Sequence, residues 1–448
     1  MSELQEPRGG SAGASDRPVQ GALGANRVSP WKVLAWAMWD WGTQPFATVV
    51  TTFVFSVYLT SSVFGDKDEL SIRLAWVTAA AGVLIALLAP VLGQGSDRTG
   101  KRMFNLRWQT LLLAAVCGAM YFVAPEPQYW ILGALLLGAG NIVSEVANVN
   151  YYASIDQVST PQNVGRVSGV GWGMGYLGGI VILLLIIVVR GSDFGPDDVR
   201  VAMLFCGAWT VLFTIPTFLA IRDVPRTGPV EKVGFFASYR ELWASIKRIY
   251  ATSPSTIHFL IASAIFRDGL AGVFTFGGIL AEGTFGFTFF EVVVFGVVAN
   301  VTAGLSTMAF GALDDKIGPK KVIVISLVSM VVLGLLVFFL HSLGSIVFWV
   351  CGLLLTVFVG PAQSASRSYL ARLIPAGKSG EVFGLYATTG RAVSFLSSTA
   401  FGAAIAIAAL IGGPGKWQFA GILGIVAVLL VGLLVLLPVK SDSDHRSH

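Results

Sequence analysis

Six ionisable or amide side chains interrupt stretches of the sequence that are otherwise apolar. They are Asp40, Gln44, Glu145, Arg267, Asp268 and Arg391. A charged side chain at the centre of a bilayer costs about 2.5 kcal/mol or more, so these groups should face a cavity or a partner. An arginine there can hold a carboxylate, and an aspartate can carry a proton. The set suits the binding of a zwitterionic or anionic solute; mutual neutralisation in structural pairs is the alternative.

The first of these groups are expected in a helix that proline disturbs. Asp40 lies about nine residues, or ~14 Å, into the apolar run 31–59. Gln44 follows one turn later, and Pro45 removes a backbone hydrogen bond beside it. This pattern predicts a locally broken helix whose freed carbonyls face the solute path. A buried aspartate that bonds a neighbouring helix is the alternative interpretation.

The remaining groups are spread over three other apolar runs. Arg267 and Asp268 occupy, in a later run, the place that matches Asp40, and we expect one of them to meet Arg391 or Asp40 across a central cavity. Glu145 lies nearer the cytoplasmic end of its run. It is expected to act either as a gate or proton site, or as a polar clamp between helices.

A charged motif occurs twice, 218 residues apart, each time between two apolar runs. The copies are Gly93-Gln-Gly95-Ser-Asp97-Arg98-Thr-Gly100-Lys101-Arg102 and Gly311-Ala-Leu-Asp-Asp315-Lys316-Ile-Gly318-Pro-Lys320-Lys321. A membrane protein built as two copies of one half commonly forms its path between the copies. The repeat therefore predicts two related halves and indicates transport.

The aspartate of each motif is expected to dock at the start of a helix in the other half, where unsatisfied backbone N–H groups favour an anion. Asp97 should dock near residues 379–380, and Asp315 near residues 165–166. Arg367 or Arg372 is a second expected partner of Asp315. The resulting cytoplasmic gate comprises Asp97, Arg98, Arg166, Asp315, Arg367, Arg372 and Glu381.

Twelve apolar runs must position these groups. The chain of 448 residues is 54% hydrophobic and 12% charged, with a mean hydropathy of +0.74. Each run can cross about 30 Å of hydrocarbon, which predicts an all-α membrane protein with twelve transmembrane helices in two six-helix bundles. The expected divisions are a disordered cytoplasmic tail at 1–30, a bundle at 31–221, a cytoplasmic linker at 222–255 with an amphipathic helix at 235–248, a bundle at 256–439 and a cytoplasmic tail at 440–448.

The basic residues predict the orientation. Of the 30 lysines and arginines, 23 lie in the two tails and in the loops on the same side of the membrane as the tails. The other seven are Lys67, Arg73, Arg190, Arg200, Arg267, Arg391 and Lys416. An excess of basic residues marks the cytoplasmic side, so both termini are expected there, in a bacterial-type plasma (inner) membrane. The same bias accounts for the net charge of +5 without a nucleic-acid partner.

The repeated motif and the twelve runs resemble the major facilitator superfamily over residues of about 31–440. Finer similarity to its vacuole-effluxer-like branch lies at 39–48, 165–179, 363–375 and 381–386. The resemblance implies a secondary active transporter that works by alternating access. It also implies an amino acid or similar small metabolite as solute, since the branch includes a fungal vacuolar effluxer of amino acids. The fourth run lacks the arginine common in the superfamily, which argues against sugar- or drug-transporter chemistry.

Other classes of function have little support in the sequence. The scattered cysteines and histidines predict no metal site and no cofactor, and no nucleotide-binding loop or intramembrane-enzyme motif is present, so no enzyme is expected. The expected partners are a small-molecule solute, a coupling ion (a proton above sodium) and the lipid bilayer, with a monomer as the functional unit. Transport of a lipid or another organic anion, or a receptor or scaffold that does not transport, are the alternatives.

Overall fold

The computed structural model describes residues 28–190, 195–224, 233–374, 377–413 and 417–439, and all regular structure within them is helical. The all-α class is therefore confirmed. The tails expected at 1–30 and 440–448 lie outside the described residues, apart from residues 28–30.

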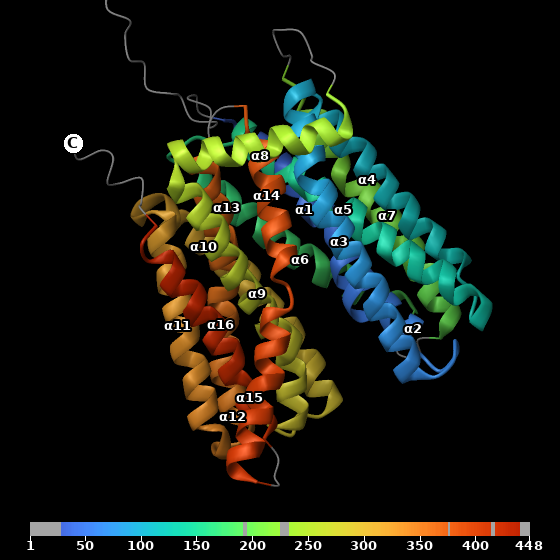
Figure 1. Cartoon of the computed structure of the whole chain (residues 1–448). Helices are drawn as coiled ribbons and strands as arrows, with labels where there is room; N and C mark the ends of the chain where they lie inside the picture. The colour runs from blue at the N-terminus through green and yellow to red at the C-terminus, as the bar shows by residue number, and fades with distance from the viewer. Residues whose placement is uncertain (1–27, 191–194, 225–232, 375–376, 414–416, 440–448) are drawn as a thin grey trace, which may run out of the picture.

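The chain forms two halves that lie side by side, joined by a helix that crosses one end of both (Figure 1). The first half comprises α1 (Pro30–Pro45), the π-helical η1 (Phe46–Phe53), α2 (Phe55–Leu59), α3 (Lys67–Thr99), α4 (Arg102–Ala119), α5 (Trp130–Ala153), α6 (Val164–Arg190) and α7 (Pro196–Ala220). The crossing helix is α8 (Phe235–Thr252). The second half comprises α9 (Pro254–Gly283), α10 (Phe289–Ile317), α11 (Pro319–Phe339), α12 (Ser345–Val347), the π-helical η6 (Phe348–Gly352), α13 (Leu353–Leu373), α14 (Ser379–Ala392), α15 (Leu396–Gly412) and α16 (Gly421–Leu436).

Ten helical spans among the described residues are long and apolar enough to cross a membrane. The predicted runs at 31–59 and near 104–123 are helical too but are not among the ten. The first is divided into pieces of 16, 8 and 5 residues. The other, α4, has 18 residues and includes Arg102 and Arg107. The count of twelve stays a prediction.

The disturbance expected at Pro45 takes the form of a change in helix type. From Phe46 to Phe53 the chain is π-helical, and Val54 donates its N–H to the Val49 carbonyl, five residues back. The Trp41 carbonyl, which would bond an N–H at position 45, instead accepts a bond of 3.2 Å from Nε1 of Trp209 on α7. The expectation that this freed carbonyl faces the solute path is wrong, because the carbonyl of Trp41 bonds a tryptophan of the same half.

The helix α8 covers the segment 235–248 and is amphipathic. Its buried residues recur at helical spacing and are Ser238, Leu242, Ser245 and Ile249. Its exposed face includes Phe236 and Trp243, which are 86% and 61% exposed. We call the end of the molecule that carries α8 the α8 side, and the opposite end the far side.

Two contacts tie α8 to α3. Arg98 of α3 donates to Glu241 at 3.0 Å, and Tyr239 donates its hydroxyl to the Leu87 carbonyl at 2.6 Å. Burial raises the pKa of the Tyr239 phenol above its ordinary value. The linker is thus fastened to the helix that carries the first charged motif.

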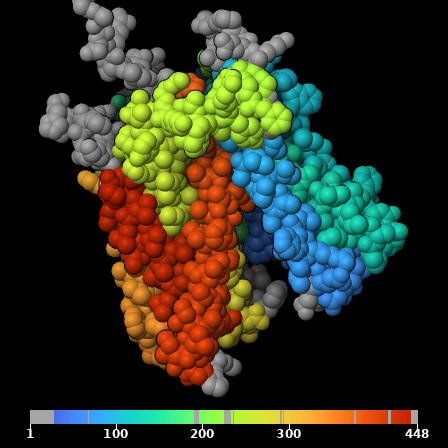
Figure 2. Space-filling model, in the orientation of Figure 1, coloured from blue at the N-terminus to red at the C-terminus, as the bar shows by residue number. Residues whose placement is uncertain are grey.

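The two halves touch beneath α8 and diverge toward the far side (Figure 2). On the α8 side, α3 packs against α14 and α6 against α10, and glycines allow backbone to meet backbone in both pairs. The molecule is therefore closed at one end and open at the other.

Candidate functional site

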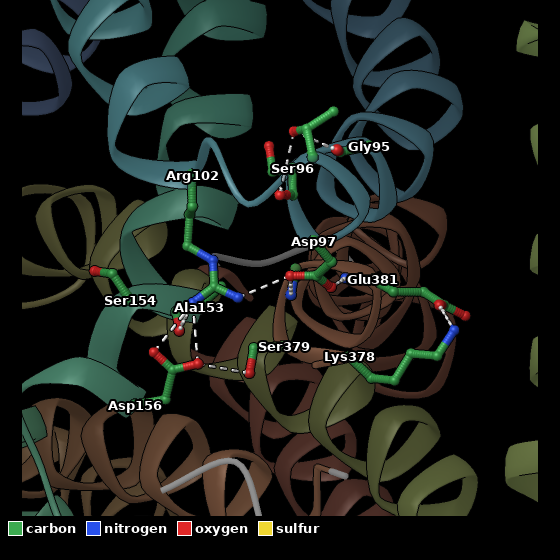
Figure 3. Close-up of polar contacts among 12 residues, drawn as sticks. Gly95, Ser96, Asp97, Arg102, Ala153, Ser154, Asp156, Lys378, Ser379 and Glu381 are labelled. Atoms are coloured by element: carbon green, nitrogen blue, oxygen red, sulfur yellow. Dashed lines mark hydrogen bonds and ion pairs between the residues drawn. The ribbon is translucent and has the colours of Figure 1, made fainter. Parts of the chain in front are cut away.

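Asp97, on the α8 side, caps a helix of the other half. Its two carboxylate oxygens accept the backbone N–H groups of Gly380 and Glu381, each at 2.9 Å, in the first turn of α14. Arg102 binds Asp97 at 2.8 Å and Asp156 at 3.0 Å, and Ser379 donates to Asp156 at 3.0 Å (Figure 3). The docking predicted for Asp97 is present; its role in gating stays a prediction.

The second motif makes the same contact in the opposite direction. Asp315 of α10 accepts the N–H groups of Gly165 and Arg166, at 2.8 and 3.0 Å, in the first turn of α6. Arg372 of α13 bonds Asp314 at 2.7 Å and Asp315 at 3.2 Å. Each half therefore supplies one aspartate and one helix start, as the repeat predicts.

The other gate candidates take different places. Arg98 reaches α8 rather than the opposite half, and Arg166 contributes its backbone N–H. The Glu381 side chain is fully buried, and Lys378 bonds its Oε2 at 2.8 Å. Its Oε1 is buried without a hydrogen-bond partner.

Glycines of the motifs set how closely the halves approach. A Cβ added at Gly93 would overlap the Gly380 carbonyl, and one added at Gly311 would lie 2.8 Å from the Gly165 carbonyl oxygen. A Cβ at Gly95, two residues after Gly93 in the same helix, would meet nothing within 4 Å. These two glycines of one motif therefore form a matched pair for mutation.

We expect Gly93→Ala to open the α8 side, whereas Gly95→Ala should not. Overpacking costs roughly 1–3 kcal/mol, which corresponds to about a 5- to 150-fold shift in population. The measurement is maleimide labelling of Ser364→Cys, because the Ser364 hydroxyl is buried and has no hydrogen-bond partner. The native cysteines Cys117, Cys206 and Cys351 are buried. Equal labelling rates in the two alanine variants would contradict the prediction.

An ion pair joins the halves where the gate contacts end. Arg391 of α14 donates from Nη2 to Oε1 of Glu145 on α5 at 2.5 Å, and the two side chains are 31% and 32% exposed. Arg391 was expected to meet Arg267 or Asp268, and that expectation is wrong. The guanidinium of Arg267 lies 3.7 Å from the ring centroid of Tyr386 and bonds the Tyr386 carbonyl at 3.2 Å.

Asp268 also stays within its own half. Its Oδ2 accepts the Ser397 N–H at 2.5 Å, at the start of α15. The helices α14 and α15 are interrupted at 393–395, and the new helix start attracts the carboxylate. The predicted meeting of Asp268 with Arg391 or Asp40 therefore does not occur. Asp268 instead bonds the start of α15, a helix terminus that the sequence did not reveal.

Asp40 meets an arginine that was expected elsewhere. Arg367 does not bond Asp315; its Nη1 lies 3.5 Å from Oδ2 of Asp40, and its side chain is 1% exposed. Position 367 is more than one turn before α13 ends at Leu373, so its side chain enters the first half below the gate. Gln44, one turn after Asp40, lies against the glycines of α6, 3.3 Å from a Cβ placed at Gly175.

Sequence reasoning missed several residues of this region. The aromatic neighbours of Arg367 come from three helices, so no local pattern signals them. They are Trp36, Tyr151, Tyr152 and Trp172. Asp314 had a signal, because it stands where the first motif has a serine. A separate apolar cavity of ≈ 160 Å³ is lined by the second half and by Phe53 of the first half, and by none of the predicted site residues.

Two family models match the chain. Residues 3–183 match the Major Facilitator Superfamily, and residues 153–446 match the family described as vacuole effluxer Atg22 like. The protein is a membrane transporter of the major facilitator class. Within that class, the chain belongs to the Atg22-like vacuole effluxer family.

Two curated relatives illustrate the range of the family. The uncharacterized MFS-type transporter YxiO of Bacillus subtilis is 24% identical over 430 residues, which are 92% of this chain and 95% of the relative. Autophagy-related protein 22 of Kluyveromyces lactis is 24% identical over 327 residues, which are 66% of each chain. The chain thus spans slightly less than two thirds of this fungal relative.

Solved structures share the fold at low identity. A bacterial homologue of the iron transporter ferroportin, in an outward-facing state, has a TM-score of 0.66 and 16% identity over 92% of this chain and 99% of its own. The proton:xylose symporter XylE has a TM-score of 0.71 and 12% identity over 92% and 95% of the two chains. These likenesses concern the fold alone.

Proposed function

We propose that this chain moves a small zwitterionic metabolite, an amino acid or a similar compound, by alternating access between its two halves. The observation that carries the proposal is the Glu145–Arg391 pair across the halves, with each side chain about one third exposed. A zwitterion presents an anion that suits Arg391 and a cation that suits Glu145. When the pair separates, the anionic group of the solute can bind Arg391 and its cationic group can bind Glu145, so neither side chain is left without a counter-charge.

The gate supports a cycle with two states. The α8 side is closed by Asp97 and Asp315, which each bond two N–H groups of the opposite half. Opening this side requires both contacts to break while the far side closes. The six-helix halves at 31–221 and 256–439 would then rock as units, and a monomer contains both.

Orientation and coupling complete the proposal. Basic residues that mark a cytoplasmic face lie on the α8 side: Arg98 bonds Glu241 of α8, and Arg102 binds the neighbouring Asp97. We infer that the α8 side and both termini are cytoplasmic, in the plasma (inner) membrane of a bacterium. The intramembrane carboxylates Asp40, Glu145 and Asp268 are the candidate proton carriers, and export is the direction suggested by the family's name.

The test is flux into proteoliposomes of the purified chain, with a pool of amino acids and an imposed pH gradient. We expect gradient-driven flux in the wild type, a loss of at least about tenfold in Arg391→Ala and Glu145→Gln, and a loss of gradient dependence in Asp40→Asn. Asp197→Asn is the control, since the side chain of this aspartate is 81% exposed. Flux of no amino acid would refute the proposed solute and turn the search to organic anions and lipids.

A further inference from the structure

Arg367 is a side chain of the second half that is buried inside the first. Its guanidinium carbon lies 5.0 Å from the ring centroid of Trp36, 5.1 Å from Tyr152, 5.7 Å from Tyr151 and 5.8 Å from Trp172. All four rings belong to α1, α5 and α6, and so does the aspartate at the end of the guanidinium, Asp40. We call the four rings and Asp40 the cage. A cation enclosed by aromatic faces and a carboxylate is a favourable arrangement.

The first half holds the cage in place by its own contacts. Trp36 donates Nε1 to Oγ of Ser154 at 2.9 Å, and Tyr151 donates its hydroxyl to Oδ2 of Asp40 at 2.9 Å. The Tyr151 ring stacks between Trp36 and Trp39, with centroids 4.4 and 4.3 Å away. Trp36, Tyr151 and Asp40 are therefore held by contacts within their own half.

One nitrogen of the guanidinium lacks a hydrogen bond in this cage. The guanidinium bonds Ser168 through Nε at 2.9 Å and through Nη2 at 2.6 Å, but Nη1 is buried with no hydrogen-bond partner and faces Asp40 at 3.5 Å. Space around it is kept by Gly171, where a Cβ would come 2.8 Å from Nη2 and 2.9 Å from Oδ2 of Asp40. A cation that lies closer to Asp40 would form the hydrogen bond to its carboxylate that Nη1 of Arg367 does not make.

Opening of the α8 side removes Arg367 from the cage, because α13 and α6 belong to opposite halves and must part there. The carboxylate of Asp40 then remains among aromatic rings without its cation, which is an unfavourable state. We propose that the vacated cage binds the cationic group of the solute, a guanidinium or primary ammonium, and that Arg367 is an internal cation that displaces it when this side closes. The inference rests on the alternating access proposed above.

This assignment gives the transport cycle a direction and a solute class. The cage has high affinity for the cation while it faces the α8 side, and it loses that affinity when Arg367 returns. The returning arginine expels the solute's cationic group toward the open far side. Solutes with a cationic group beyond the zwitterionic part, such as basic amino acids, therefore gain most from both Asp40 and the Glu145–Arg391 pair.

The test is calorimetric binding of L-arginine and L-citrulline to the full chain in lipid nanodiscs. Citrulline has nearly the shape of arginine but a neutral side chain. We expect R367A to bind arginine at least tenfold more tightly than the wild type, with no such gain for citrulline, and R367A/D40N to lose the gain. Equal affinity of R367A for the two compounds, or a gain that survives D40N, would overturn the proposal. Binding does not require flux, so this result is independent of the proteoliposome test.

A second variant keeps Arg367 and decides the matter if R367A does not fold. D97N weakens the gate, and it should bind arginine at least tenfold more tightly than the wild type because Arg367 withdraws more often. D97N/D40N should lose that gain. Tighter binding in R367A but not in a D97N variant that labels at Ser364→Cys would refute the withdrawal of Arg367 on opening.

Discussion

Asp97→Asn is expected to expose the α8 side, with the labelling rate of Ser364→Cys raised at least about tenfold. Asparagine can accept one of the two N–H groups that Asp97 now accepts, but its amide NH₂ must then face the other. Each hydrogen bond to a charged group contributes roughly 1.5–3 kcal/mol, and about 1.4 kcal/mol is a tenfold change in population. The Asp97 side chain is 5% exposed, so water cannot substitute while the gate is closed.

The control for this variant is Asp197→Asn, an aspartate that is 81% exposed in a surface pair with Arg200. It changes the charge by the same amount and should leave the labelling rate unchanged. Asp315→Asn should reproduce the effect of Asp97→Asn, because Asp315 bonds two N–H groups of the other half in the same way. An unaltered rate in both gate variants would show that these contacts do not hold the α8 side closed.

Arg372→Ala should have the second large effect, on the stability of the closed state. Its loss leaves Asp314 and Asp315, whose side chains are 1% and 8% exposed, close together without their shared cation. Breaking a buried ion pair in this way costs roughly 3–5 kcal/mol. We expect a lower midpoint of thermal unfolding and faster labelling of Ser364→Cys.

A second substitution distinguishes lost charge balance from lost packing. Asp314→Asn in the Arg372→Ala chain removes one of the two unpaired charges and should restore part of the unfolding midpoint, since Ser368 still bonds position 314. Arg73→Ala, which breaks the pair with Glu69 in which both side chains are more than half exposed, should change the midpoint little. Failure of Asp314→Asn to restore stability would mean that Arg372 acts through its bulk.

The sequence predicts the parts of this molecule that rest on local pattern or on the repeat. The helix class follows from apolar runs, and the docking of Asp97 and Asp315 follows from one rule about helix starts applied twice. The pairing of Asp40, Asp268 and Arg391 could not be predicted, because it depends on helix rotation and on the interruption between α14 and α15. Arg367 was assigned to the gate because it lies, like Arg372, near the end of its run, but its position five residues before Arg372 turns it toward the first half.

The contacts of Asp97 and Asp315 are related to each other as the contacts in a symmetric dimer are. Asp97 bonds the second and third residues of α14, and Asp315 bonds the second and third residues of α6. Because each half presents the same donor patch and the same acceptor, two copies of one half could bind each other through an isologous interface. Arg367 breaks this symmetry, since the position 218 residues earlier is Val149. The interface thus combines a shared, two-fold closure with one charged side chain that makes the two halves unequal.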